Sequence, residues 1–74
     1  MTEVGLLASV ALASDVPEQG LTRGEVGTVV EFLRQNGEET LLVEFSDEEG
    51  QTYAMAALKA DQLIVLHRRR NEAA

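Results

Sequence analysis

Cysteine and tryptophan are absent from this chain, and proline, tyrosine and histidine each occur once. Without cysteine, neither a disulfide nor a thiolate metal site can form. A single histidine, His67, leaves too few ligands for an ordinary zinc site. The apolar run 4–13 is too short to cross a bilayer as a helix. We therefore expect a soluble, cytoplasmic protein that holds no metal and no cofactor and inserts into no membrane.

Basic residues are also scarce. Six lysines and arginines stand against thirteen acidic residues, which gives a net charge of −7. Three of the six are Arg68, Arg69 and Arg70, so residues 1–67 alone carry twelve acids, three bases and a charge of −9. Such a surface repels phosphates, which argues against nucleic-acid binding. It favours a basic protein partner, and it also serves solubility.

Apolar side chains alternate along short segments that are separated by turn residues, a pattern typical of β-strands. Asn36-Gly37 predicts a tight hairpin turn of the primed type, and Asp47–Gly50 predicts a second turn. The predicted strands are Leu6–Leu12, Glu25–Leu33, Thr40–Ser46, Gln51–Leu58 and Leu63–Leu66. Along the first, Leu6, Ala8, Val10 and Leu12 share one face.

The segment Asp15–Gly24 is predicted to be a loop, since Pro17 lacks a backbone donor and two glycines follow. Leu21 is apolar within it and is expected to fold back onto the core. Lys59–Asp61 is predicted to form a short helical or 3-10 turn before the last strand.

Five short strands in 74 residues indicate one all-β domain, a small five-stranded SH3-like barrel. We expect residues 1–67 to form this barrel and residues 68–74 to form a polar tail. The predicted core contains Val10, Val26, Val43, Phe45 and Leu63.

Gly27 interrupts a valine-rich strand, which indicates either a β-bulge or a close backbone crossing. Because a bulge would shift the alternation, the sequence leaves open whether Val29 or Val30 faces the core.

No set of residues has the spacing of a catalytic site, so we expect the chain not to be an enzyme. Its paired carboxylates, Glu38-Glu39 and Asp47-Glu48-Glu49, fall in predicted turns, where acids are solvated rather than held in a pocket. The serines have no neighbouring base, because the single histidine is near the end of the chain.

The run Val10–Glu31, VALASDVPEQGLTRGEVGTVVE, and the later Leu58–Leu63, LKADQL, resemble a family of small bacterial proteins that is a domain of unknown function. The resemblance implies an SH3-like barrel with no assigned activity. Members are often encoded beside other small proteins, which suggests a toxin paired with an antitoxin or immunity protein. The segment Gly24–Val29 also resembles the KOW motif of ribosome- and transcription-associated barrels, which usually carry basic residues near that turn.

These observations favour a protein-binding module that neutralises a basic partner. The residues predicted to bind it are Glu38, Glu39, Glu44, Asp47, Glu48 and Glu49. One alternative is a KOW-like nucleic-acid-binding barrel that uses Arg23, Arg34, Lys59 and the arginines at 68–70. A second is an accessory subunit that associates through a sheet edge. The sequence leaves the partner and the oligomeric state open.

Overall fold

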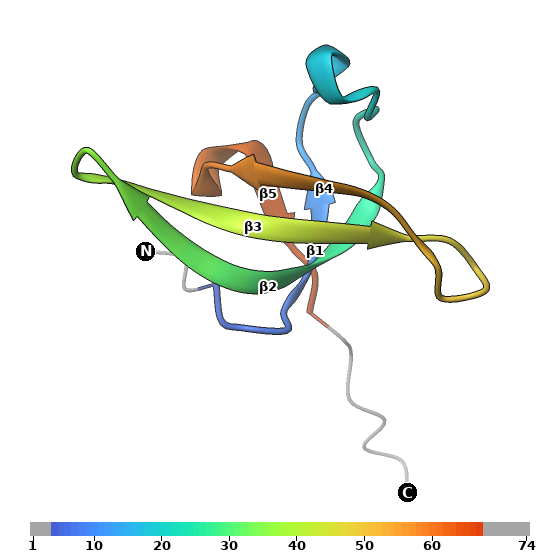
Figure 1. The fold of residues 1–74 in the computed structure, drawn as a ribbon. Helices are drawn as coiled ribbons and strands as arrows, with labels where there is room; N and C mark the ends of the chain where they lie inside the picture. Colours follow the sequence, from blue (N-terminus) through green and yellow to red (C-terminus); the bar gives the residue numbers. More distant parts are fainter. Residues whose placement is uncertain (1–3, 68–74) are drawn as a thin grey trace, which may run out of the picture.

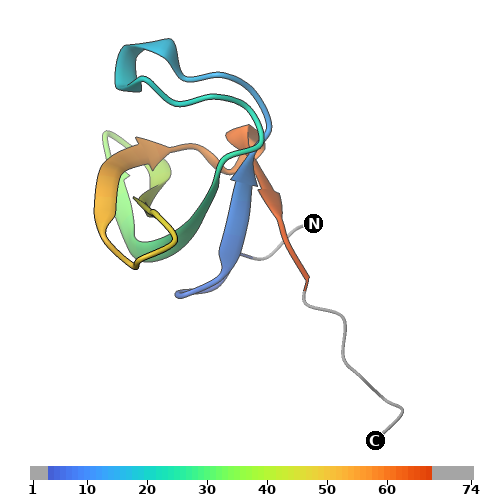
Figure 2. The same ribbon diagram turned by 90° about the vertical axis from the view of Figure 1, so that its right-hand side faces the viewer.

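A computed structural model describes residues 4–67, and the predicted tail at residues 68–74 lies outside them (Figure 1). Five strands form one antiparallel sheet in the order β4-β3-β2-β1-β5. The elements are β1 (Ser9–Leu12), the 3-10 turn η1 (Pro17–Gln19), β2 (Val26–Gln35), β3 (Glu38–Ser46), β4 (Thr52–Leu58), the 3-10 turn η2 (Ala60–Gln62) and β5 (Leu63–Val65). Figure 2 shows the sheet coiled into a barrel, which confirms the predicted fold class.

Strand β2 holds the two halves of the sheet together. Its first residues, Val26–Thr28, pair with β1, and its longer remainder, Thr28–Gln35, pairs with β3. Gly27 lies where β2 passes from one partner strand to the other, opposite Val10. The β2–β3 hairpin closes through Asn36 and Gly37, whose φ angles of 51° and 79° are those of the predicted primed turn.

The core gathers the inward side chains of all five strands and two residues of the η1 loop. Its buried members are Val10, Leu12, Val16, Leu21, Val29, Leu41, Val43, Phe45, Ala56, Leu58 and Leu63. Leu21 therefore folds back onto the core as predicted. The backbone N–H of Val16 donates to the carbonyl of Leu21, and this bond closes the base of the loop.

One predicted core residue and one predicted strand boundary are wrong. Val26 is 50% exposed because it pairs with Ala11 on the outer face, while Gly27 and Val29 occupy the inward positions of β2. Leu6 is 58% exposed because the first strand begins only at Ser9. The positive φ of Leu7, 66°, ends the alternation before that strand.

A bulge in β2 answers the question of which valine faces inward. The register with β3 shifts between Val29 and Glu31, so Val30 is the extra residue. Val29 pairs with Val43 and is fully buried, whereas Val30 is half-buried. The sequence offered a bulge or a close backbone crossing as the explanation for Gly27, and the structure has both. The close approach is at Gly27 itself, and the bulge lies three residues later, at Val30.

Gly27 is required for space rather than for an unusual backbone angle. A Cβ atom there would lie 2.6 Å from Cγ1 of Val43 and 2.8 Å from the backbone oxygen of Glu44. Real Cβ atoms essentially never approach so closely, and the backbone oxygen belongs to a paired strand that has little freedom to move.

We predict that Gly27→Ala lowers the free energy of unfolding by about 2 kcal/mol, since it overpacks the core. Gly27→Val should cost more. Gly5→Ala is the matched control, because nothing lies within 4 Å of a Cβ added at Gly5. Urea denaturation of the three variants and the wild type measures the effect, and equal midpoints for Gly27→Ala and Gly5→Ala would contradict it.

Candidate functional site

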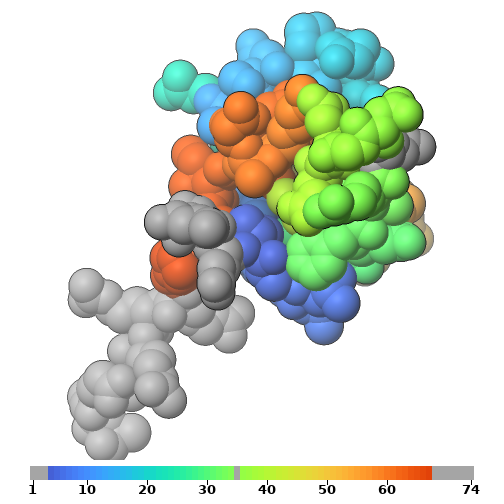
Figure 3. All heavy atoms as spheres, turned by 90° about the vertical axis from the view of Figure 1, so that its left-hand side faces the viewer, coloured from blue at the N-terminus to red at the C-terminus, as the bar shows by residue number. Residues whose placement is uncertain are grey.

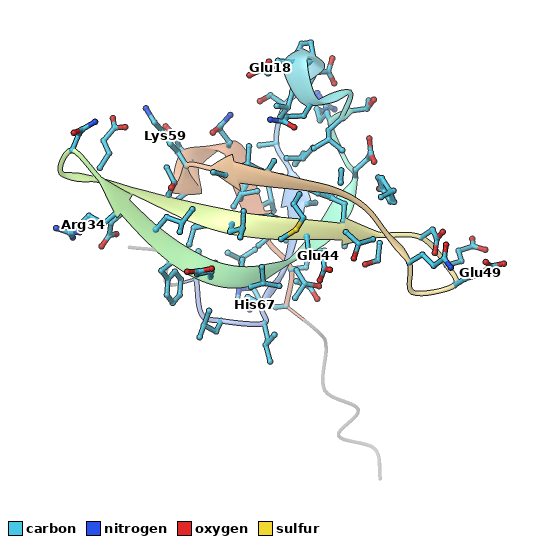
Figure 4. All side chains as sticks on the ribbon, viewed as in Figure 1. Glu18, Arg34, Glu44, Glu49, Lys59 and His67 are labelled. Carbon is cyan, nitrogen blue, oxygen red and sulfur yellow. The ribbon has the colours of Figure 1, made fainter. Side chains whose placement is uncertain are left out.

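The predicted binding residues are divided between the two ends of β3. Glu38 and Glu39 lie where β3 begins, beside the β2–β3 hairpin turn, and Asp47, Glu48 and Glu49 lie in the turn that follows it. Glu44 lies between them on the outer face of the strand, where it pairs with Thr28 and Met55. In Figure 4, Arg34 and Lys59 mark the hairpin end and Glu49 marks the opposite end.

The carboxylates at the hairpin end are neutralised by nearby cations. A nitrogen of Arg34 lies 2.9 Å from Oε2 of Glu39, and Nζ of Lys59 lies 3.2 Å from Oε2 of Glu38. All four side chains are more than half exposed, so these ion pairs add little to stability. They nevertheless offset the charges of both hairpin carboxylates, Glu38 and Glu39.

Residues Asp47–Gly50 form the turn between β3 and β4, which we call the acidic turn. Unlike the acids at the hairpin end, its acids form no ion pair within residues 4–67. Oδ1 of Asp47 accepts backbone N–H groups from Glu49 and Gln51, each at 2.9 Å. Asp47 therefore shapes the turn, as aspartate often does. Glu48 and Glu49 are exposed, and among residues 4–67 neither forms an ion pair.

Two further carboxylates are held by hydroxyl groups of β4. The hydroxyl of Thr52 donates to Glu44. The hydroxyl of Tyr53 donates to Oε1 of Glu25 at 2.6 Å, while the N–H of Thr22 donates to Oε2 at 2.7 Å. The hydrogen bond from Tyr53, followed by that from Thr22, lowers the pKa of Glu25 below its ordinary value of 4.5. The same contact raises the pKa of Tyr53 above 10.0.

A shallow groove opens at the hairpin end of the barrel. Its lining includes Phe32 and Leu41 from β2 and β3, Val4 and Gly5 from the N-terminal segment, and Ala60 from η2. Figure 3 views this end, where the blue N-terminal segment, the green hairpin and the orange η2–β5 region meet. Glu39 at its rim is already paired with Arg34, so the groove offers an apolar surface without a free charge of its own.

Within residues 4–67, the residues of the nucleic-acid alternative do not form one unpaired basic surface. Arg34 and Lys59 are occupied by Glu39 and Glu38, while Arg23 lies in the loop between η1 and β2. Arg68–Arg70 lie outside the described residues. Within residues 4–67, no group of three or more histidine, cysteine or acidic side chains could hold a metal ion. No helix of the described part is long and apolar enough to span a membrane.

The strand order, the loop bearing η1 and the 3-10 turn before β5 define an SH3-like β-barrel domain. The family model for the domain of unknown function DUF4926 matches residues 6–65, and the chain belongs to this family. No curated protein and no solved structure gives a significant match.

The ion pairs at the hairpin end were missed from the sequence. The stretch Gln35–Leu58 contains six acids and no base, yet Arg34 and Lys59 immediately flank it. Cross-strand pairing of Arg34 with Glu39 was readable from the hairpin register that Asn36-Gly37 predicts. The contact between Lys59 and Glu38 depends on how β4 lies beside β3, so no local signal could reveal it.

We predict that Tyr53→Phe raises the pKa of Glu25 towards 4.5, because the strongest hydrogen bond to the ionised carboxylate is lost. Carbon-detected NMR titration of Glu25 measures this change. In the reciprocal variant, Glu25→Gln, the pKa of the single tyrosine should fall towards 10.0, as followed by ultraviolet absorbance.

The pH dependence of stability has a defined sign. Since its folded-state pKa is lowered, Glu25 contributes stability that is present above pH 4.5 and is lost as the pH falls through the folded value. In the Tyr53→Phe variant, the free energy of unfolding should therefore depend less on pH below about 4.5. If Glu25 titrates identically in wild type and Tyr53→Phe, the contact is absent in solution.

Proposed function

We propose that this chain is a non-catalytic module that binds a basic protein, as an antitoxin or immunity protein covers the basic surface of its toxin. The observation that supports the proposal is that, in the described part of the chain, the few basic side chains pair with acids at only one end of β3. Within residues 4–67, Arg34 and Lys59 neutralise the hairpin end, while Glu48 and Glu49 of the acidic turn form no ion pair. A basic partner would therefore be attracted more strongly to the acidic turn than to the hairpin end.

The surroundings of the acidic turn support this orientation. Asp47 fixes the turn through two backbone hydrogen bonds, so Glu48 and Glu49 project from a shaped loop. Tyr53 and Met55 follow on β4 and are 52% and 47% exposed. Glu44 lies beside Met55 on the neighbouring strand. Exposed apolar side chains beside carboxylates suit a basic surface, since charge speeds encounter and apolar contact slows dissociation.

Each acidic cluster is expected to attract a basic partner only over a short distance. Residues 40–46 of β3 separate the two acidic clusters, which is roughly 25 Å of strand at the usual rise. This exceeds the Debye length of about 8 Å at physiological salt. The two ends therefore act as separate patches, and neutralising one should not imitate neutralising the other.

We predict that the double variant Glu48→Gln/Glu49→Gln binds its partner at least about tenfold more slowly at low salt than the wild type. The matched control is Glu38→Gln/Glu39→Gln, which changes the net charge equally at the already neutralised end. Asp47 is left unchanged because it shapes the turn.

The wild type and both double variants would serve as bait in parallel co-purifications from native cells, followed by stopped-flow association with the recovered protein. We expect a basic partner, loss of recovery with the acidic-turn variant, and slower association as salt rises. A neutral or acidic partner, or equal rates for the two variants, would refute the proposal.

A further inference from the structure

Where the start of β2 pairs with β1, and β1 with β5, the outer face of the sheet carries no charged side chain among residues 4–67. The register places Val26, Ala11 and Ile64 in one row and Thr28 beside Ser9 in the next. Leu66 continues beyond β5, with its N–H donating to the carbonyl of Ser9 at 2.9 Å. We call these six residues the charge-free face.

This face is exposed and largely aliphatic. Ile64 is 53% exposed, Val26 is 50% exposed and Leu66 is 40% exposed. None of the three is needed to fill the core, whose members lie on the opposite side of the same strands. Adjacent exposed aliphatic side chains in a sheet commonly mark a contact surface.

Two carboxylates that border the charge-free face, those of Glu25 and Glu44, bind groups that lie outside it. Glu25 precedes Val26, but both its oxygens are engaged, one by the hydroxyl of Tyr53 on β4. Glu44 pairs with Thr28 across the sheet, and its carboxylate accepts the hydroxyl of Thr52, also on β4. The hydrogen bonds therefore gather negative charge towards β4 and leave the β1–β5 side without it.

We propose that two copies of this chain associate through the charge-free face, so that the outer face of one sheet packs against the same face of the other. The distribution of charge favours a second copy of the chain as the binding partner of this face. Residues 1–67 carry a charge of −9, so most other surfaces would bring carboxylates of two copies together. A strongly basic partner, in contrast, gains no electrostatic attraction on a face without charge.

The dimensions of the face set the strength of the contact. Its outer strands are about 10 Å apart, the width of three adjacent strands. Face-to-face packing of two such sheets is a common arrangement, but the buried area is at the small end of protein interfaces. We therefore expect a weak dimer that forms as the concentration rises, with the acidic turns still accessible to another protein.

The sign of the salt effect separates this association from binding to a basic partner. Salt screens the repulsion between two acidic copies, so dimerisation should strengthen as salt rises. Binding of a basic protein should weaken under the same conditions. The two proposals can therefore fail independently of each other.

The test is sedimentation equilibrium of the full chain from about 10 µM to 1 mM, the range of weak interfaces, at low and high salt. Ile64→Lys and Val26→Lys place a charge on the face from two different strands. Met55→Lys is the matched control, since Met55 is also an exposed apolar residue, on β4. Circular dichroism identifies any variant that fails to fold. If one of the two face variants is unfolded, the dimerisation of the other tests the proposal.

We expect the wild type and Met55→Lys to approach the dimer mass, more readily at high salt. The dissociation constants of Ile64→Lys and Val26→Lys should rise by at least about tenfold, because each dimer buries two unpaired ammonium groups. A wild type that stays monomeric overturns the proposal. So does a dimer that weakens with salt, or one that Met55→Lys disrupts as strongly as the folded face variants.

Discussion

The close approach of β2 to β3 at Gly27 is the constraint on which the rest of the barrel depends. β2 serves both halves of the sheet, and Gly27 lies where its pairing passes from β1 to β3. The space that a Cβ would need is filled by Val43 and Phe45, both fully buried. Because the sheet can coil tightly there, a chain of 74 residues encloses a continuous core without cysteine or tryptophan.

The coiled sheet also separates the charges of the molecule. Arg34 and Lys59 lie at the hairpin end of β3 and pair with Glu39 and Glu38, while the acidic turn lies at the other end. The hydroxyl groups of Thr52 and Tyr53 hold further carboxylates near β4. Within residues 4–67, one part of the outer face is consequently acidic and another carries no charge.

Several features could be predicted because they depend on neighbouring residues. Asn36-Gly37 specified its turn, because both residues tolerate positive φ. Strict alternation placed Val43 and Phe45 in the core, where both are fully buried. Val26 was assigned wrongly, because its orientation depends on pairing with Ala11 in a distant segment. The neutralised hairpin end was overlooked for a similar reason, since Lys59 reaches Glu38 only in the folded sheet.

The sequence by itself determined the all-β class, the strand periodicity, the hairpin turn and the large negative charge, because each is a property of composition or of residues close together in the chain. Only the tertiary structure decided that Gly27 serves close packing, that Val29 rather than Val30 faces inward, and which acids are neutralised. It also placed Val26, Ala11 and Ile64 side by side. These features depend on register and on contacts between distant strands, and register is a property of the whole sheet rather than of any one segment.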